Sequence, residues 1–369
     1  MIYLDNGATS FHKPEAVYRG VWQAMKTCAN PGRGGYGAAM EASRQVYRCR
    51  EEAAGLFDCR PEQVAITGSC TQGLNIAIRS LLKPGGRAVV SGFEHNAVTR
   101  PLAALGCKIA VAGRRLFRRE DTLEEFRREL KKGADAAVVT HVSNVFGYIL
   151  PVEEIAGMCR EYGIPLILDA AQSAGSLPVS LRSLGAAFIA MPGHKGLLGP
   201  QGTGLLLCAD SAQPLFYGGT GSTSILQEMP EELPERLEAG TMNVPGIAGL
   251  TKGLEYLNKI GVDAVFKREH RQLKRCAAGL QQLGYRVFAG PHQAATVSFL
   301  PRGDCESAAQ VFARMGIAVR AGLHCAPFAH ESAGTLETGT VRVSFGYDAN
   351  DRQTDGFLRA AAKLTAFRQ

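Results

Sequence analysis

The chain of 369 residues is 46% apolar and 20% charged, and its formal net charge is +7. This is the composition of an ordinary globular enzyme, and the chain is long enough for two domains. The basic residues between positions 114 and 132 are interleaved with acidic ones, so no nucleic-acid partner is expected. No run approaches the roughly 18 apolar residues of a membrane span and no export signal is seen, so we expect no membrane association and a reducing, cytoplasmic setting.

The first part of the chain is expected to place two helices before a short strand. Residues 1–14 read as an extended segment, and Pro14 opens a helical pattern. A glycine-rich loop at residues 30–35 separates this helix from a second one over residues 38–57. Residues 64–67 form a short apolar run that predicts a strand.

Strands and helices then alternate, which predicts a parallel or mostly parallel sheet covered by helices. The predicted strands span residues 87–91, 108–112, 135–142, 164–169, 188–191 and 204–208, and the predicted helices span residues 74–82, 122–131 and 152–161. A long loop rich in Gly, Pro and Glu follows at residues 217–245. Beyond it we expect a smaller α+β region with helices over residues 247–260, 263–283 and 353–367 and strands over residues 295–300 and 340–344.

An acid and a lysine follow two of the predicted strands. Asp169 ends one apolar run, and Lys195 comes shortly after the next. Because the carboxyl ends of strands in an open α/β sheet face the ligand crevice, both side chains are expected at one site. The pair suits pyridoxal phosphate (PLP), whose Schiff base needs a lysine and whose ring nitrogen is kept protonated by an acid. Either residue alone is better explained as a turn-capping aspartate or a surface lysine.

Other strand ends carry weaker candidates. The segment Gly68–Gly73 lies between a strand and a helix, where backbone N–H groups and the Thr71 hydroxyl can hold a phosphate, although many such turns are rich in small residues for steric reasons alone. The His95 ring could stack on a flat cofactor, or it could be an ordinary surface or core histidine. Asn144 and Gln172 could donate to a cofactor oxygen, or they could cap a turn and a helix.

One of the ten cysteines stands apart from the others. None of the ten forms a C-x-x-C pair, so no zinc or other metal site is expected, and most are expected to be small buried hydrophobes. Cys325 instead lies among Gly and Pro residues near His324 and Arg320, a setting that favours exposure and a nucleophilic thiolate. On a later strand, Arg342 has apolar neighbours, and it could clamp a substrate carboxylate or form a structural ion pair.

Taken together, these motifs resemble the cysteine desulfurase/selenocysteine lyase family, which are PLP-dependent class V aminotransferases of fold type I. The resemblance covers nearly the whole chain, and its most specific parts are the motifs around Lys195 and Cys325. The matching segments are Tyr3–Asn6, Glu94–Asn96, His141–Asn144, Asp169–Gln172, Gly193–Gly196, Glu238–Thr241, Arg320–Cys325 and Arg342–Ser344.

The resemblance implies the α/β fold of a fold type I PLP-dependent transferase. A large PLP-binding domain over residues 15–246 would hold a mostly parallel seven-stranded sheet. A smaller α+β C-terminal domain over residues 247–369 would carry the cysteine loop, and residues 1–14 would pack with it. A homodimer is expected, because Thr241 would reach the phosphate bound by the neighbouring subunit.

The resemblance also implies roles for individual residues. Lys195 would form the Schiff base, Cys325 would be the nucleophile, and His95 would stack on the ring beside them. The other implied cofactor contacts are Asp169 at the ring nitrogen, Gln172 and Asn144 near the ring oxygen, Cys70, Thr71 and His194 around the phosphate, and Thr241 from the neighbouring subunit. The implied substrate contacts are Arg342, Asn6 and Arg33. Pro192 and Cys70 stand where relatives carry hydroxyl residues, which leaves the strength of phosphate binding open.

The implied reaction converts L-cysteine to L-alanine and leaves the sulfur on Cys325 as a persulfide. L-selenocysteine is an alternative substrate, and a sulfur- or selenium-accepting protein is a possible partner. Two other hypotheses remain. Another class V reaction, an aminotransferase or a C–S lyase, would need Lys195 and Asp169 but not Cys325. A non-catalytic sulfur-relay protein would use Cys325 and bind no PLP.

Overall fold

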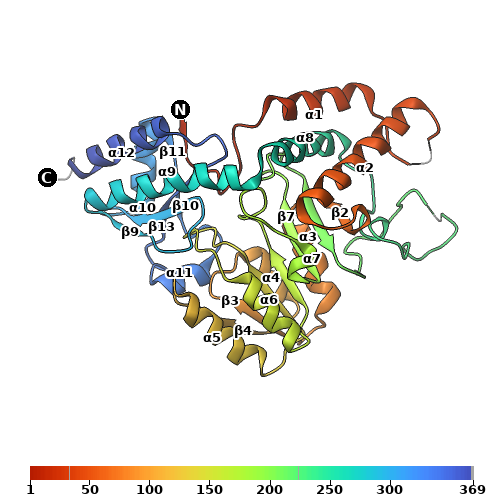
Figure 1. Cartoon of the computed structure of the whole chain (residues 1–369), viewed down its shortest axis with the longest axis horizontal. Coiled ribbons are helices and arrows are strands. Elements are labelled where there is room, and N and C mark those ends of the chain that lie inside the picture. Colours follow the sequence, from red (N-terminus) through yellow and green to blue (C-terminus); the bar gives the residue numbers. More distant parts are fainter. Residues whose placement is uncertain (33, 223, 367–369) are drawn as a thin grey trace.

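A seven-stranded sheet lies at the centre of the computed structural model, which describes residues 1–32, 34–222 and 224–366 (Figure 1). The strand order is β2-β8-β7-β6-β5-β3-β4, and every strand is parallel to the others except β8. The strands are β2 (Val64–Thr67), β3 (Arg87–Ser91), β4 (Lys108–Ala112), β5 (Ala136–Thr140), β6 (Leu166–Asp169), β7 (Phe188–Pro192) and β8 (Gly204–Cys208). The expected mostly parallel seven-stranded sheet is confirmed.

These strands read as continuous apolar runs because both faces of the sheet are covered. In β5, Ala136 and Val138 pack into the core on one face, whereas Ala137 and Val139 pack into the core on the other. The helices of this part of the chain are α1 (Glu15–Thr27), α2 (Gly37–Phe57), α3 (Cys70–Leu81), α4 (Asn96–Ala104), α5 (Arg119–Leu130), α6 (Val152–Glu161), α7 (Leu181–Leu184) and α8 (Val244–Ile260), with short 3-10 turns η1 (Pro61–Gln63) and η2 (Glu235–Leu237).

The C-terminal region forms a second, four-stranded antiparallel sheet in the order β12-β13-β10-β9, with its own core around Phe299, Phe312 and Phe357. Its elements are α9 (Val262–Gln282), β9 (Arg286–Phe288), β10 (Thr296–Leu300), α10 (Cys305–Arg314), β12 (Arg320–Gly322), α11 (Pro327–Ala333), β13 (Thr340–Ser344) and α12 (Asp351–Ala366). Figure 1 shows α9 running from the end of α8 across to this region.

The N-terminal segment joins the C-terminal region. Strand β1 (Ile2–Tyr3) pairs in parallel with β11 (Ile317–Ala318), and Asp5 forms an isolated bridge with Ser344. The domain boundaries at residues 14 and 246 remain a prediction.

The sequence analysis did not predict some short elements near strand ends. Helix α4 was not predicted, and Pro101 inside it interrupts the helical pattern. Helix α3 begins at Cys70 rather than at Leu74, because the Ser69 side chain caps it by accepting from the Gln72 backbone N–H at 3.2 Å. The predicted end of the last helix at residue 367 lies outside the described residues. No helix within the described ranges is long and apolar enough to cross a membrane.

Candidate active site

The predicted acid and lysine follow adjacent parallel strands of the large sheet. Asp169 is the last residue of β6, and Lys195 comes just after β7, which pairs directly with β6. The backbone around Lys195 is packed closely. A Cβ added at Gly175 would collide with the carbonyl oxygen of Gly196, and Gly175 has a φ of +94°, so only glycine fits there without strain. This packing fixes the path of the loop that carries Lys195.

A cavity of about 240 Å³ opens at these strand ends, and we call it the Lys195 cavity. It is lined by every predicted cofactor residue except Thr241. These lining residues are Cys70, Thr71, His95, Asn144, Asp169, Gln172, His194 and Lys195. The structure therefore brings together residues that are far apart in the sequence.

Lys195 is half-buried beside Asp169 and Arg342. Burial lowers the pKa of its amine, and the nearby Arg342 guanidinium lowers it further, while the Asp169 carboxylate acts in the opposite direction. A lowered pKa increases the fraction of neutral amine at neutral pH, which is the form that attacks a carbonyl or accepts a proton.

Asp169 is almost fully buried and is held by two donors. Its Oδ1 accepts a hydrogen bond from the Ala171 backbone N–H at 2.9 Å and a weak one from the Cys70 thiol at 3.6 Å. The buried Cys70 side chain thus faces the carboxylate, and burial beside Asp169 raises the pKa of its thiol well above the usual range. At this site Cys70 is a neutral donor to Asp169 rather than a nucleophile.

Two histidines of the cavity are held neutral. The His95 side chain caps α4, with Nδ1 accepting from the Ala97 backbone N–H at 3.0 Å, so its ring proton sits on Nε2. Burial lowers the pKa of His95, and it lowers the pKa of His194 to about 4. The Nδ1 atom of His194 lies 3.1 Å from the Thr9 hydroxyl, which ties the lysine loop to the N-terminal segment.

Cys325 lies on a strained turn next to the cavity residues. Among the cysteines of the described chain it is the one exposed to solvent. His324 and Cys325 have φ values of +50° and +56°, a conformation that costs free energy for residues with a side chain. The turn is held by two contacts: the Asn96 backbone N–H donates to the Cys325 carbonyl at 2.7 Å, and the Asn144 side chain donates to the His324 carbonyl at 2.8 Å. The amide nitrogen of Asn144 is therefore engaged with the cysteine turn.

Arg342 projects from β13 and is 2% exposed. Its Nη1 donates to the Asn144 carbonyl at 3.0 Å and its Nη2 donates to Asp5 Oδ1 at 2.7 Å. Its Nε has no hydrogen-bond partner within the described part of the chain. An unpaired, buried N–H on a guanidinium is a donor available for a carboxylate.

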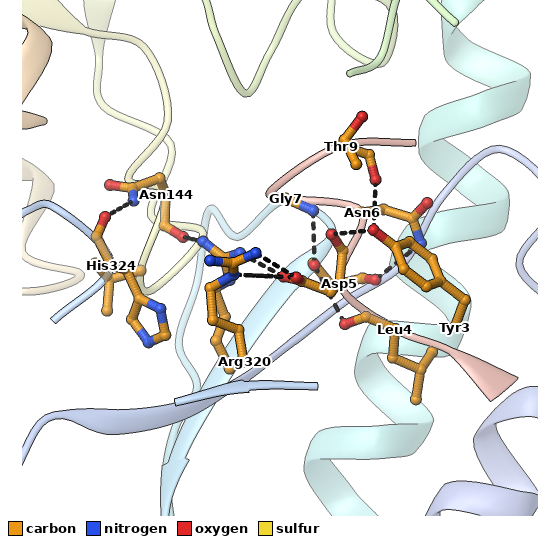
Figure 2. A network of polar contacts seen from close by, with 12 residues as sticks. Tyr3, Leu4, Asp5, Asn6, Gly7, Thr9, Asn144, Arg320 and His324 are labelled. Carbon is orange, nitrogen blue, oxygen red and sulfur yellow. Dashed lines mark hydrogen bonds and ion pairs between the residues drawn. The ribbon is translucent and has the colours of Figure 1, made fainter. Parts of the chain in front are cut away.

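The N-terminal segment, whose residues Asp5, Asn6 and Gly7 are labelled in Figure 2, packs against this arginine. Gly7 lies against the Arg342 guanidinium, where a Cβ would come within 3.2 Å of Cζ. The Gly7 carbonyl accepts from the Gln172 side chain at 3.0 Å, and the Asn6 side chain donates to the Ser344 carbonyl at 3.1 Å. Gln172 is thus held next to Gly7, and Asn6 is held at the end of the strand that carries the predicted substrate arginine.

One predicted residue stands apart from this group, and the position of another is not described. Thr241 lines another cavity, of about 310 Å³, together with Gly68 and Gln72, and does not line the Lys195 cavity of its own chain. Arg33 lies outside the described residues.

Sequence reasoning gave no role to two buried acids of the site. Asp5 bridges Arg342 and Arg320. Glu94 is fully buried, and its Oε1 accepts from the backbone N–H groups of Thr140 at 2.9 Å and Ser91 at 3.2 Å, which fastens the ends of β5 and β3 beside His95. Burial raises the pKa of Glu94 to about 8. Glu94 comes three residues after the end of β3, and that position was the available signal for it.

The residues present fit the cofactor that the sequence predicts. The cavity, at about 240 Å³, is slightly smaller than the about 300–1,000 Å³ typical of ligand pockets. It offers an amine of lowered pKa, a buried carboxylate for a ring nitrogen, a neutral imidazole, and the N-terminus of α3 for a phosphate. Within the described ranges no group of three or more His, Cys, Asp or Glu side chains is arranged to hold a metal ion.

Comparison with known proteins agrees with this site. The chain is 32% identical over 368 residues to a probable cysteine desulfurase of Methanothermobacter thermautotrophicus, covering 94% of this chain and 90% of that protein. It is 32% identical over 380 residues to a probable cysteine desulfurase of Pyrococcus abyssi, covering 99% and 94%. The solved apo structure of a cysteine desulfurase from Thermococcus onnurineus NA1 superposes with a TM-score of 0.92 at 30% identity, covering 99% of this chain and 95% of that one. Residues 2–357 match the family model for aminotransferase class-V, so the chain belongs to this family of PLP-dependent enzymes.

Proposed function

We propose that the chain is a PLP-dependent cysteine desulfurase that converts L-cysteine to L-alanine and keeps the sulfur on Cys325 as a persulfide. The observation that carries the proposal is the exposed Cys325, whose turn is fastened to residues that flank or line the Lys195 cavity. A class V transaminase reaction needs no exposed thiol at this position. The names of the relatives and structural neighbours support the same activity.

The cofactor would be held by the residues of the Lys195 cavity. Lys195 would bind its carbonyl carbon, Asp169 would hold the proton on its ring nitrogen, and Thr71 and His194 would face its phosphate. When bound, PLP supplies an electron sink that stabilises the charge left at Cα after a proton departs. The neutral His95 presents a ring face without adding positive charge next to Lys195.

The chain's own groups would do the remaining chemistry. The free Nε of Arg342 is a donor for the substrate α-carboxylate. The Lys195 amine, with its lowered pKa, would take the Cα proton. The Cys325 sulfur would attack the sulfur of the substrate, so that an S–S bond forms and the C–S bond of the substrate breaks. The one proton lost from the two thiols equals the proton gained when the CH₂ group of cysteine becomes the CH₃ group of alanine, the Cα proton taken by Lys195 is restored in alanine, and no external oxidant is needed.

We also propose that the enzyme is a homodimer. Helix α1 packs on α8 through Val17 and Ala24, yet exposes Tyr18, Trp22 and Met25 at helical spacing on its other side. An exposed apolar stripe of this kind is typical of an interface. A second copy would cover it, and it would also give Thr241 a site to complete. A sulfur-accepting protein would then take the persulfide from the exposed Cys325.

An alanine-release assay tests the activity. The purified protein, loaded with PLP, is given L-cysteine or L-selenocysteine, with Cys325→Ala measured in parallel. We expect alanine from L-cysteine with the natural protein and almost none with the variant. L-selenocysteine, whose selenium leaves more readily, is expected to depend less on Cys325. Equal alanine release from L-cysteine by both proteins would favour another class V lyase. A protein that retains no PLP would favour a sulfur relay.

A further inference from the structure

Asp5 is a nearly buried carboxylate that binds two arginines at once. It is 9% exposed, and its Oδ1 accepts from Arg342 Nη2 at 2.7 Å. Arg320 donates to the same carboxylate from Nε, at 3.0 Å to Oδ2, and from Nη2, at 2.9 Å. Figure 2 shows Asp5 on the N-terminal segment, with Arg320 reaching toward it from the opposite side. Neither arginine has another carboxylate partner within the described residues.

The two arginines need such a counter-charge. Arg320 on β12 and Arg342 on β13 are direct cross-strand partners in an antiparallel pair. Like charges directly opposite each other destabilise a sheet. The carboxylate of Asp5 lies between them, and its hydrogen bonds raise the pKa of Arg320 while burial lowers the pKa of Arg342. Asp5 therefore holds together a strand pair that would otherwise repel at this position.

The same two arginines lead to different parts of the site. Arg342 is the proposed partner of the substrate carboxylate. Arg320 lies at the start of the turn that carries Cys325, and the Cys325 sulfur is close enough to act electrostatically on its guanidinium. Arg342 also reaches the turn by a second route, because its Nη1 binds the Asn144 carbonyl and the Asn144 side chain binds the His324 carbonyl. Arg342 is thus linked through Asp5 to Arg320, which precedes the turn, and through Asn144 to His324, the residue before Cys325.

We propose that Asp5 is a positioning residue that couples the substrate carboxylate at Arg342 to the Cys325 turn, an inference that rests on the proposed function. A carboxylate that arrives at Arg342 competes with Asp5 for the same guanidinium and repels it. Asp5 then shifts its hydrogen bonding toward Arg320. The turn holds two residues at positive φ, a strained conformation that persists only while its surroundings fix it, so a change at Arg320 is transmitted to Cys325. Cys325 thereby responds to the presence of a substrate before any sulfur moves.

The first test follows the Cys325 thiol directly. The PLP-loaded protein is treated with iodoacetamide, and alkylation of the peptide that contains Cys325 is followed by mass spectrometry with and without L-alanine, which has the α-carboxylate of the substrate but no sulfur. We expect L-alanine to change the alkylation rate by on the order of fivefold or more in the natural protein and by much less in Asp5→Asn. Asp355→Asn, which removes the same charge from an exposed ion pair with Arg275, is the matched control and should respond like the natural protein.

The second test separates positioning from a general loss of structure. Asp5→Asn leaves Arg342 without its nearest anion, so we expect KM for L-cysteine to stay equal or fall while kcat falls about tenfold or more. A purely structural defect would raise KM together with the loss of kcat. Arg320→Gln, which leaves the Asp5–Arg342 pair in place, should also lose the L-alanine response, and it carries the test if Asp5→Asn does not fold.

Three results would overturn the proposal: no response of Cys325 to L-alanine in the natural protein, an undiminished response in both Asp5→Asn and Arg320→Gln, or a raised KM for L-cysteine in Asp5→Asn, whether or not kcat also falls. The alkylation measurement needs no sulfur transfer. A protein that releases no alanine from L-cysteine but keeps an Asp5-dependent response would therefore refute the proposed desulfurase activity and leave the coupling standing.

Discussion

Glu269 offers a test of the structure that does not depend on catalysis. It lies on the buried face of α9, is 7% exposed, and lines a cavity of about 40 Å³ that Lys195 also lines. Its carboxyl makes no hydrogen bond or ion pair with the described residues. Burial raises its pKa from 4.5 to about 8. Such a carboxyl is neutral in the folded protein at pH 7 and ionised in the unfolded chain.

The sign and size of the effect follow from this difference. Below about pH 4.5 the carboxyl is protonated in both states and has no pH-dependent effect on stability. As the pH rises toward 8 the unfolded state is increasingly favoured, and the destabilisation is complete above pH 8. A pKa raised from 4.5 to about 8 corresponds to about 5 kcal/mol of unfolding free energy at most. Glu269→Gln keeps the shape of the side chain and removes this loss.

Urea unfolding of the natural protein and Glu269→Gln at several pH values between 5 and 9 measures the effect. We expect the unfolding free energy of the variant, relative to that of the natural protein, to increase by up to about 1.4 kcal/mol per pH unit and to level off above pH 8. Glu124→Gln, at an exposed position of α5, is the control and should show no such gain. A difference in unfolding free energy between Glu269→Gln and the natural protein that stays constant from pH 5 to pH 9 would refute the burial of an unpaired carboxyl.

Three further predictions concern the lysine loop and the expected dimer. Gly175→Ala should lower the unfolding free energy by about 3 kcal/mol or more, because the new Cβ meets the Gly196 carbonyl. Gly163→Ala, also at positive φ but in open space, should lower it by only about 1 kcal/mol. Equal losses of unfolding free energy in urea would contradict the close packing at Gly175. Trp22→Glu should convert a dimer to a monomer by light scattering, and an unchanged mass would place the interface elsewhere. Lys195→Ala should keep its fold but retain no PLP after borohydride treatment, and a covalently labelled variant would contradict the assignment of the lysine.

The sequence predicted the large sheet well because its strands are buried on both faces. Strand β3 has the predicted bounds, and β5 is only shorter than predicted, since unbroken apolar runs are characteristic of parallel strands covered on both sides. The order β2-β8-β7-β6-β5-β3-β4 was not predicted, because strand order depends on pairings between distant residues.

Contacts between distant residues also limited what the sequence could predict at the site. The sequence could place Lys195, Asp169 and His95 at one site from their positions at the ends of strands, and all three line the Lys195 cavity. Asp5 could not, because its partners Arg320 and Arg342 are 315 and 337 positions away in the chain. Cys70 was expected around the phosphate, and its thiol donates to Asp169; this contact could not be predicted because the two residues are 99 positions apart in the chain.

The persulfide itself gives the most direct test of the proposed activity. The PLP-loaded protein is incubated with L-cysteine without reductant. The mass of the peptide that contains Cys325 is then measured by mass spectrometry, and the alanine formed is quantified. We predict that this peptide alone gains the mass of one sulfur atom, that a reductant removes it, and that one alanine forms for each persulfide. Alanine formation without added sulfur on Cys325, or with the sulfur on another cysteine, would contradict the account.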